Sequence, residues 1–175
     1  MTQLARILSG AGLTALLSVF LAIPVVAAPP TFQTTAKQAI LLDFDTGAVL
    51  FAKNADTPMF PASMTKIMTS IIAFDELRAG RLQLDSMLRV SETAWRKGGS
   101  KMFVRVNDEV RFEDLLRGVI VQSGNDASIV VAEGISGTEA AFAGRMTERA
   151  REIGLDNSIF RNATGWPDPD HVTTA

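Results

Sequence analysis

Two short apolar runs near the start of the chain predict a pair of β-strands. Residues 38–43 and 48–53 form these runs, and Phe44-Asp45-Thr46-Gly47 between them has the composition of a hairpin turn. Because aspartate side chains hydrogen-bond readily to nearby backbone, we expect Asp43 and Asp45 to shape this turn rather than to act as an acid–base pair.

From residue 61 the apolar spacing becomes that of a helix. Pro61 suits a first helical turn, where its missing amide hydrogen would have no partner. Apolar side chains between Met64 and Leu77 cover most of the helix circumference. We therefore expect a helix buried on all sides, with Ser63 in its first turn and Lys66 as the only cation in the stretch.

Helical spacing recurs in the rest of the chain. Ser91 is suited to cap a short helix that begins at Glu92, and Gly154 is suited to end a longer one. The longer predicted helices cover residues 112–121, 126–133 and about 138–153.

The remaining segments show weaker patterns. Residues 104–110 suit a short extended segment, residues 81–90 are mixed, and residues 162–170 are rich in turn-forming types. The predicted fold is α+β, with an N-terminal β-hairpin followed by a mostly helical body.

The first 28 residues have the features of an export signal. Arg6 supplies a positive charge, an apolar run follows, and small residues precede Pro29. Cleavage after Ala28 would leave proline at the next position, so cleavage after Ala27 is an alternative. An uncleaved membrane anchor is a second alternative, because the run is almost long enough to span a bilayer, but Ser9, Gly10, Gly12 and Pro24 interrupt it. Residues 29–37 are then a leader, and residues 38–175 the folded domain.

Composition narrows the possible chemistry. The formal net charge of −2 gives no general attraction to nucleic acid or anionic lipid. The chain has no cysteine, which excludes disulfides and a thiol nucleophile, and its single histidine leaves little from which to build a zinc site. We expect no metal and no cofactor, in a protein exported to the periplasm or to an external cell-wall space.

Ser63 and Lys66 form a Ser-x-x-Lys motif, whose spacing suits a nucleophile and its base. Helical residues three apart lie on one face, with Cβ atoms about 5–6 Å apart. A serine hydroxyl needs a nearby base, and burial lowers the pKa of a lysine far enough to provide one. We expect the apolar helix to supply that burial, and the unpaired amides of its first turn to stabilise an oxyanion.

Ser123-Gly124-Asn125 breaks the pattern between two predicted helices. Such a sequence is ordinary in solvent-facing turns. The functional alternative is a turn directed into the site, in which Ser123 relays a proton to the leaving group and Asn125 holds the substrate backbone. His171 fits a structural hydrogen-bonding role better than a Ser-His-Asp triad. Trp95 and Trp166 are interpreted as packing residues.

Longer stretches around both motifs, from about Lys37 to the last residue, follow the pattern of one family. They are residues 39–43, 46–47, 61–69, 99–103, 115–118, 122–127, 162, 165 and 167–171. In these stretches the chain resembles the penicillin-binding serine D-alanyl-D-alanine carboxypeptidases, which share the Ser-x-x-Lys signature. The resemblance implies a DD-peptidase/β-lactamase-like fold.

The resemblance also implies a reaction. The family removes the terminal D-alanine from peptidoglycan stem peptides that end in D-alanyl-D-alanine. Ser63 is implied as the nucleophile that forms an acyl-enzyme and Lys66 as the general base, with Ser123 as proton relay and Asn125 in substrate binding. β-Lactam antibiotics, which mimic the peptide end, are implied to acylate Ser63.

One part of the family pattern is absent. No lysine of the chain precedes Thr-Gly, so the third motif, Lys-Thr-Gly on a strand bordering the site, is missing. The strands that complete the antiparallel sheet are missing with it. We expect a C-terminally truncated chain with little or no turnover, whose membrane association would depend on the signal or on a C-terminal anchor that is absent here.

Two other functions stay open at this point. A serine β-lactamase needs a carboxylate to assist the deacylating water, and residues 157–167 contain no glutamate, with Asp156 the nearest acid. A non-catalytic penicillin- or peptidoglycan-binding fragment is the second alternative.

Overall fold

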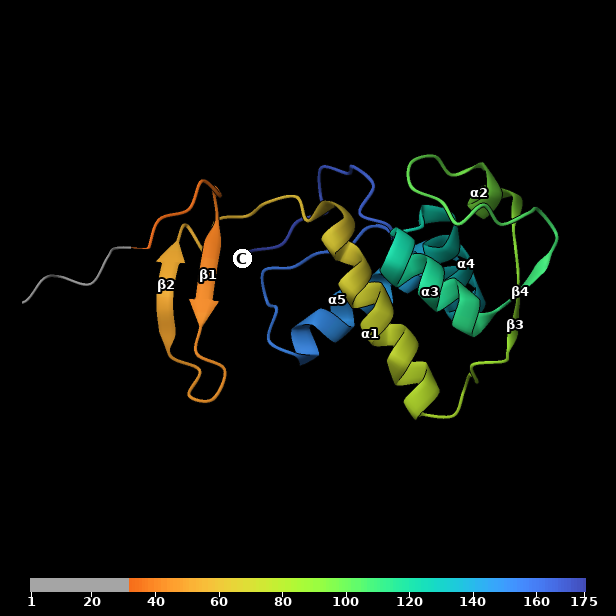
Figure 1. Cartoon of the computed structure of the whole chain (residues 1–175), viewed down its shortest axis with the longest axis horizontal. Helices are drawn as coiled ribbons and strands as arrows, with labels where there is room; N and C mark the ends of the chain where they lie inside the picture. Colours follow the sequence, from red (N-terminus) through yellow and green to blue (C-terminus); the bar gives the residue numbers. More distant parts are fainter. Residues whose placement is uncertain (1–31) are drawn as a thin grey trace, which may run out of the picture. The chain divides into compact units, whose positions relative to one another are not determined.

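The computed structural model describes residues 32–175. The predicted signal peptide at residues 1–28 and the start of the predicted leader therefore lie outside the described residues. All elements below fall in the unit formed by residues 34–175 (Figure 1). Within the described part of the chain, no helix combines the length and apolar character that crossing a bilayer requires.

The predicted N-terminal hairpin is present. Strands β1 (Ala39–Leu42) and β2 (Val49–Lys53) pair antiparallel, with Ala39 opposite Lys53. The Asp43 carboxylate accepts hydrogen bonds from the Thr46 amide at 2.8 Å and the Thr46 hydroxyl at 2.6 Å. These two bonds lower the pKa of Asp43. The prediction that Asp43 shapes the turn is confirmed.

Five α-helices make up most of the body. Their bounds are α1 (Thr65–Arg78), α2 (Glu92–Arg96), α3 (Phe112–Gln122), α4 (Asn125–Ser136) and α5 (Glu139–Glu152). A 3₁₀ turn, Ala62–Met64, precedes α1. The Ser91 hydroxyl accepts from the Ala94 amide at 3.0 Å, as expected of a cap, and Gly154 follows α5 with a φ of 86°. The predicted helices are confirmed with small changes at their ends.

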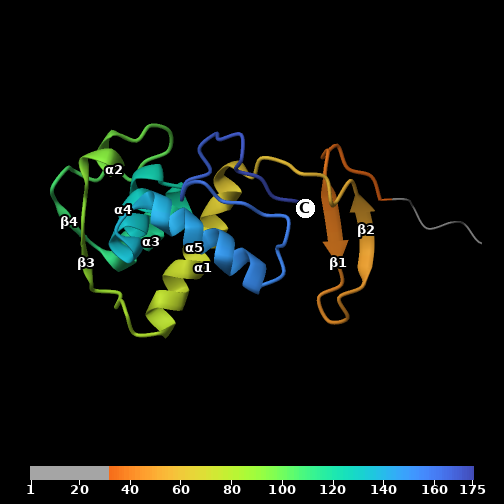
Figure 2. The same ribbon diagram turned by 180° about the vertical axis from the view of Figure 1, so that it is seen from behind.

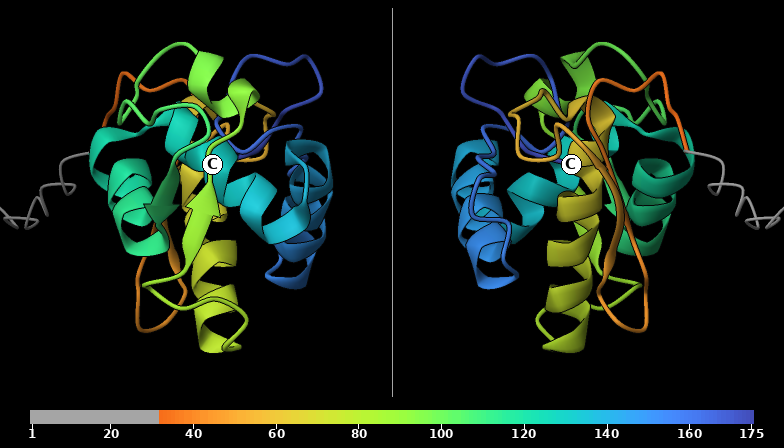
Figure 3. Two further views of the ribbon diagram at one scale, coloured as in Figure 1. Left: turned by 90° about the vertical axis from the view of Figure 1, so that its right-hand side faces the viewer. Right: turned by 90° about the vertical axis from the view of Figure 1, so that its left-hand side faces the viewer.

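Helix α4 is the central element of this body. It contacts α1, α2, α3 and α5, and its residues 125–132 are all buried. Figure 1 shows α1 and α3 on the near side, and Figure 2 shows α4 and α5 from behind. Both views of Figure 3 place α1 between α3 and α5. Large core side chains, fully or almost fully buried, come from α1, α3, α4 and α5: Ile72, Phe112, Leu115, Ile129, Phe142 and Met146.

A second two-stranded sheet is present that the sequence did not predict. Strands β3 (Met87–Arg89) and β4 (Glu109–Arg111) pair antiparallel. Each strand has three residues, and Leu88 is the only one of the six that is buried. The alternating pattern is therefore too short to read in the mixed segment 81–90, and the expected extended segment 104–110 overlaps β4 only in part.

The prediction that the first long helix is buried on all sides is wrong. On α1, Ile67 is 64% exposed and Phe74 is 47% exposed. The buried face of the helix carries polar residues, including Thr65, Lys66 and Glu76, beside apolar ones such as Ile72. The apolar pattern did not show which side faces solvent, because polar groups elsewhere in the chain pair with Lys66 and Glu76.

Candidate active site

Ser63 lies in the strained turn that leads into α1. Ala62, directly before it, has a φ of 47°, a region that residues other than glycine seldom adopt. Gly165, from the C-terminal segment, packs against this turn so closely that a Cβ at Gly165 would lie 1.7 Å from the Ala62 carbonyl oxygen. Two segments far apart in sequence therefore fix the backbone beside the nucleophile candidate.

Lys66 points from α1 into a set of three acceptors. Its Nζ lies 3.3 Å from the Ser63 hydroxyl oxygen, 2.8 Å from the Asn125 side-chain oxygen and 2.8 Å from the Thr164 carbonyl oxygen. The residue is only 5% exposed. Three N–H groups and three acceptors are matched, so the ammonium form is held in one orientation.

Burial lowers the pKa of Lys66 to about 8. At pH 7 about one molecule in ten then carries the neutral amine. The neutral amine has two N–H groups and one lone pair. If the N–H groups keep the two shorter bonds, to Asn125 and Thr164, the lone pair faces the Ser63 hydroxyl. This arrangement suits a general base acting on a serine nucleophile.

Asn125 is held in place by hydrogen bonds from both its side-chain amide and its backbone N–H. Its Nδ2 donates to the Gly98 carbonyl at 2.8 Å, and its backbone N–H donates to the Ser100 carbonyl at 2.7 Å. A Cβ at Gly99 would lie 2.6 Å from Nδ2. Asn125 therefore orients Lys66 and ties the 98–100 loop to α4.

Asp126 is a functional neighbour that sequence reasoning missed. Its carboxylate is fully buried and accepts the backbone N–H groups of Met102, Phe103, Val104 and Ala127 at 2.8–3.2 Å. These bonds hold the loop before β4 against the first turn of α4, beside Asn125. An acidic residue heading an otherwise apolar helix was the available signal.

Ser123 ends α3 in a left-handed conformation with a φ of 54°. It lines a cavity of about 410 Å³ together with Ser63 and Lys66. The apolar part of the wall comes from Ile67, Ile71, Phe74, Val119 and Ile120. The structure thus brings the four predicted site residues together, Ser63, Lys66 and Asn125 through hydrogen bonds and Ser123 through the shared cavity.

His171 has a structural position. Its Nδ1 accepts from the Arg161 amide at 3.3 Å, so Nε2 carries the proton and donates to the Thr65 hydroxyl at 2.9 Å. Burial lowers the pKa of His171, which favours this neutral form. The hydrogen-bonding role expected from the sequence is confirmed.

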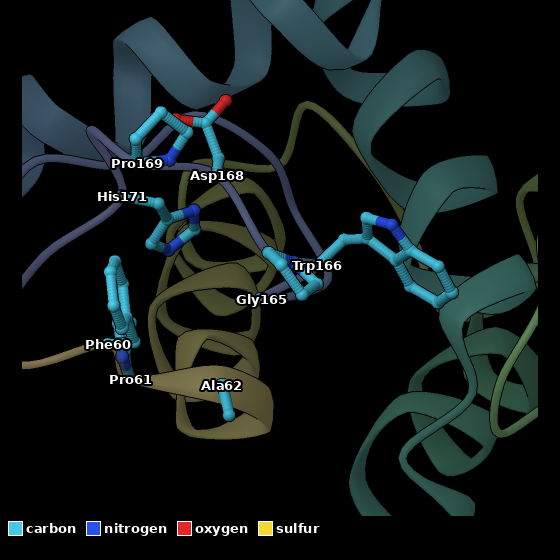
Figure 4. A pocket seen from close by; sticks show the side chains of 9 residues that line it. Phe60, Pro61, Ala62, Gly165, Trp166, Asp168, Pro169 and His171 are labelled. Atoms are coloured by element: carbon cyan, nitrogen blue, oxygen red, sulfur yellow. The ribbon is translucent and has the colours of Figure 1, made fainter.

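A second cavity of about 320 Å³ lies on the other side of the Pro61-Ala62 turn. Figure 4 shows Phe60 and His171 facing it, with Gly165 and Ala62 contributed by two different segments. The Trp166 indole is directed away from Phe60 and His171 (Figure 4). Ser63 is not among the residues that line this cavity.

Comparison with known proteins points to one family. The family model described as D-alanyl-D-alanine carboxypeptidase, Peptidase S11, matches residues 24–175. The chain is 41% identical over 140 residues to D-alanyl-D-alanine carboxypeptidase DacF of Bacillus subtilis, covering 80% of this chain and 36% of that protein. It is 36% identical to D-alanyl-D-alanine carboxypeptidase DacC of Escherichia coli over 184 residues, covering 100% of this chain and 46% of that protein.

Solved structures agree. D-alanyl-D-alanine carboxypeptidase DacD from Francisella tularensis superimposes with a TM-score of 0.82 at 41% identity, covering 86% of this chain and 37% of that chain. Penicillin binding protein 5 from Haemophilus influenzae gives a TM-score of 0.80 at 39% identity, covering 85% and 44%. The fold is that of the DD-peptidases, and the chain spans less than half the length of these relatives.

Proposed function

Because the chain belongs to the D-alanyl-D-alanine carboxypeptidase family, we propose that it carries the nucleophile half of a serine D,D-carboxypeptidase site. The observation that supports this most directly is the position of the buried Lys66 amine, 3.3 Å from the Ser63 hydroxyl and held by Asn125 and Thr164. The proposed substrate is a peptidoglycan stem peptide that ends in D-alanyl-D-alanine.

The reaction proceeds in two steps. The Ser63 oxygen attacks the carbonyl carbon of the penultimate D-alanine while its proton passes to the neutral Lys66 amine. The peptide C–N bond then breaks, and Ser123 passes a proton from the lysine to the departing amine of the terminal D-alanine. Water then attacks the resulting ester while Lys66 accepts a proton from it, and Lys66 returns this proton to the Ser63 oxygen as the ester bond breaks, which restores the serine.

Asn125 has two tasks in this proposal. It orients Lys66 in the substrate-free protein, where both ends of its amide are already bonded. A substrate backbone that approaches the Lys66 side would share the Asn125 amide with the lysine. First-turn amides of the helix, including that of Ser63, would stabilise the oxyanion.

Export to the periplasm or the outer face of the cytoplasmic membrane is part of the proposal. The support is the signal-like sequence of residues 1–28 and the location of the substrate, which is cell-wall material. β-Lactams are proposed to acylate Ser63 because they mimic the end of the stem peptide.

Labelling with a fluorescent penicillin tests the proposal. The purified chain should form a covalent adduct, located at Ser63 by peptide mass spectrometry, and Ser63→Ala should abolish it. Ser70→Ala is the matched control, because Ser70 lies on α1, the helix that follows Ser63, and lines the same cavity. A chain that gives no adduct under conditions where it is folded would refute the proposed function.

D-Alanine release from a stem-peptide analogue, measured on the same preparation, tests turnover. The chain has no Lys-Thr-Gly sequence, and we expect acylation with little or no release. Rapid hydrolysis of penicillin would instead favour a β-lactamase.

A further inference from the structure

The segment 162–166 contacts several parts of the candidate site. The Thr164 carbonyl accepts from Lys66, and the Ala163 carbonyl accepts from the Thr69 hydroxyl at 2.8 Å. Gly165 packs on Ala62, beside the nucleophile. The position of this segment therefore affects both the base and the turn that carries Ser63.

One side chain organises the segment. The Asn162 Oδ1 accepts from the Thr164 amide at 3.1 Å, the Thr164 hydroxyl at 3.0 Å, the Gly165 amide at 2.8 Å and the Trp166 amide at 3.0 Å. Its Nδ2 donates to the Trp166 carbonyl at 3.0 Å. The loop is thus wrapped around the Asn162 amide.

The bond to Gly165 sets the direction of the acceptor that Lys66 uses. The Thr164 carbonyl and the Gly165 N–H belong to the same planar trans peptide group, in which C=O and N–H point in opposite directions. When Asn162 Oδ1 binds the Gly165 N–H on one side, the Thr164 oxygen is directed to the other side, where it meets Lys66 Nζ at 2.8 Å.

The bonds to Trp166 connect Asn162 to the loop of residues 97–99, which lies against the Trp166 ring. Lys97 Nζ lies 4.4 Å from the centre of the Trp166 ring, and a Cβ at Gly99 would lie 3.4 Å from that ring. The loop containing Gly98 and Gly99 accepts the Asn125 Nδ2–H. Figure 4 shows the indole turned away from the Phe60 cavity, consistent with these contacts.

We propose that Asn162 is a positioning residue for acylation, whose side-chain amide directs the Thr164 carbonyl at Lys66 and so aims the base at Ser63. The proposal rests on the proposed function of this site. It also makes a prediction that does not require turnover, because the environment of Lys66 can be measured directly.

The test uses the chain labelled with [¹³C]lysine and a pH titration of the lysine side-chain signals by NMR. The signals to be distinguished come from Lys37, Lys53, Lys66, Lys97 and Lys101, and the Lys66→Met variant identifies the one of interest. Asn162→Ala is compared with Asn157→Ala, an exposed asparagine in the same part of the chain. Asn162→Ser keeps one acceptor oxygen and serves as the conservative variant.

We expect Asn162→Ala to admit water to Lys66. The titration midpoint of Lys66 should then rise from about 8 toward the ordinary pKa of a lysine, by about one pH unit or more. Asn162→Ser should fall between this result and the unaltered protein, and Asn157→Ala should leave the midpoint unchanged. The rate of penicillin acylation at pH 7 should fall about tenfold or more in Asn162→Ala.

These measurements distinguish a failure of the inference about Asn162 from a failure of the proposed function. A lower melting temperature in both Asn162 variants, with the Lys66 midpoint and the acylation rate unchanged, would assign Asn162 a structural role only and overturn the inference. If the unaltered chain forms no penicillin adduct but the midpoint still moves in Asn162→Ala, the proposed reaction fails and the control of Lys66 by Asn162 stands.

Discussion

Gly165→Ala is expected to destabilise the fold and to displace the proposed nucleophile, Ser63. Gly165 has a φ of 79°, and a Cβ there would lie 1.7 Å from the Ala62 carbonyl oxygen and 2.3 Å from its carbonyl carbon. Real Cβ contacts essentially never fall below 3.0 Å. The two backbone segments would therefore have to separate by more than 1 Å, and both atoms in conflict are backbone, which cannot swing aside.

Gly154→Ala is a matched control, because it measures the cost of the left-handed backbone conformation without a steric clash. Gly154 has a φ of 86°, and a Cβ there meets no atom within 4 Å. Gly154→Ala should cost about 1–2 kcal/mol for the left-handed conformation alone, which lowers the melting temperature by about 5 °C in a chain of this size. Gly165→Ala adds about 2 kcal/mol for forced separation of packed segments, for a fall of about 10 °C or more.

Acylation should respond more strongly than stability. Separation of the segments displaces Ala62, next to Ser63, and the Thr164 carbonyl that holds Lys66. A displacement of about 1 Å can cost about 100-fold in rate. Melting is followed by circular dichroism, and acylation by the rate of fluorescent penicillin incorporation well below the melting temperature. The reasoning is refuted if Gly165→Ala melts with Gly154→Ala and is acylated at the unaltered rate.

The further predictions concern three buried charged residues, Lys66, Glu76 and Asp126. Because the pKa of Lys66 is about 8, the acylation rate at low penicillin concentration should rise as pH increases through about 8 and then level off; a flat profile would exclude this lysine as the base. The unfolded chain binds more Lys66 protons between about pH 8 and the ordinary pKa of 10.5, so chemical denaturation should show stability increasing with pH over that window. Glu76 is buried, and hydrogen bonds from two arginines lower its pKa to about 2, so its contribution to folding stability is present above the ordinary pKa of 4.5 and is lost as pH falls toward 2. Glu76→Gln should cost about 2 kcal/mol at pH 7, with the solvent exposure of the arginines taken into account, whereas Glu152→Gln, at an exposed ion pair, should cost less than about 0.5 kcal/mol. Asp126→Asn places an amide among backbone N–H donors and should lower the free energy of unfolding, measured by urea denaturation, by about 2–4 kcal/mol. Asp108→Asn, at an exposed position, should leave the urea midpoint unchanged.

The parts of the fold that sequence could predict are the local ones. The hairpin turn depends on Asp43 and Thr46, three residues apart, and the cap of α2 depends on Ser91 and Ala94, also three residues apart. The β3–β4 sheet depends on pairing such as Met87 with Arg111. Nothing in either short strand specifies its partner, so the pairing was not predictable.

The candidate site likewise has a local part that the sequence could predict and a long-range part that it could not. Ser63, in the turn before α1, and Lys66, in the first turn of α1, are three residues apart, so their spacing alone suggested a nucleophile and a base. Thr164 contributes a backbone carbonyl, which any residue type would provide, and no side-chain pattern marks it. Asn162 was noticed only as part of a family resemblance, because its role is to shape a loop that does not resemble a motif.

The pKa of Lys66 shows how a correct expectation can have an incomplete cause. The sequence predicted that an apolar helix would lower this pKa by burying the lysine, but the neighbouring Ile67 is 64% exposed. Burial is still the cause of the lowered pKa, but part of the enclosure comes from Asn125, 59 residues away, and Thr164, 98 residues away, which accept hydrogen bonds from the amine. A purely apolar enclosure would leave the ammonium without partners, whereas these two acceptors also fix its orientation. The orientation of Lys66, the proposed base, therefore depends on residues that the Ser-x-x-Lys motif does not contain, and substitutions in the 162–166 segment should alter it without any change to α1.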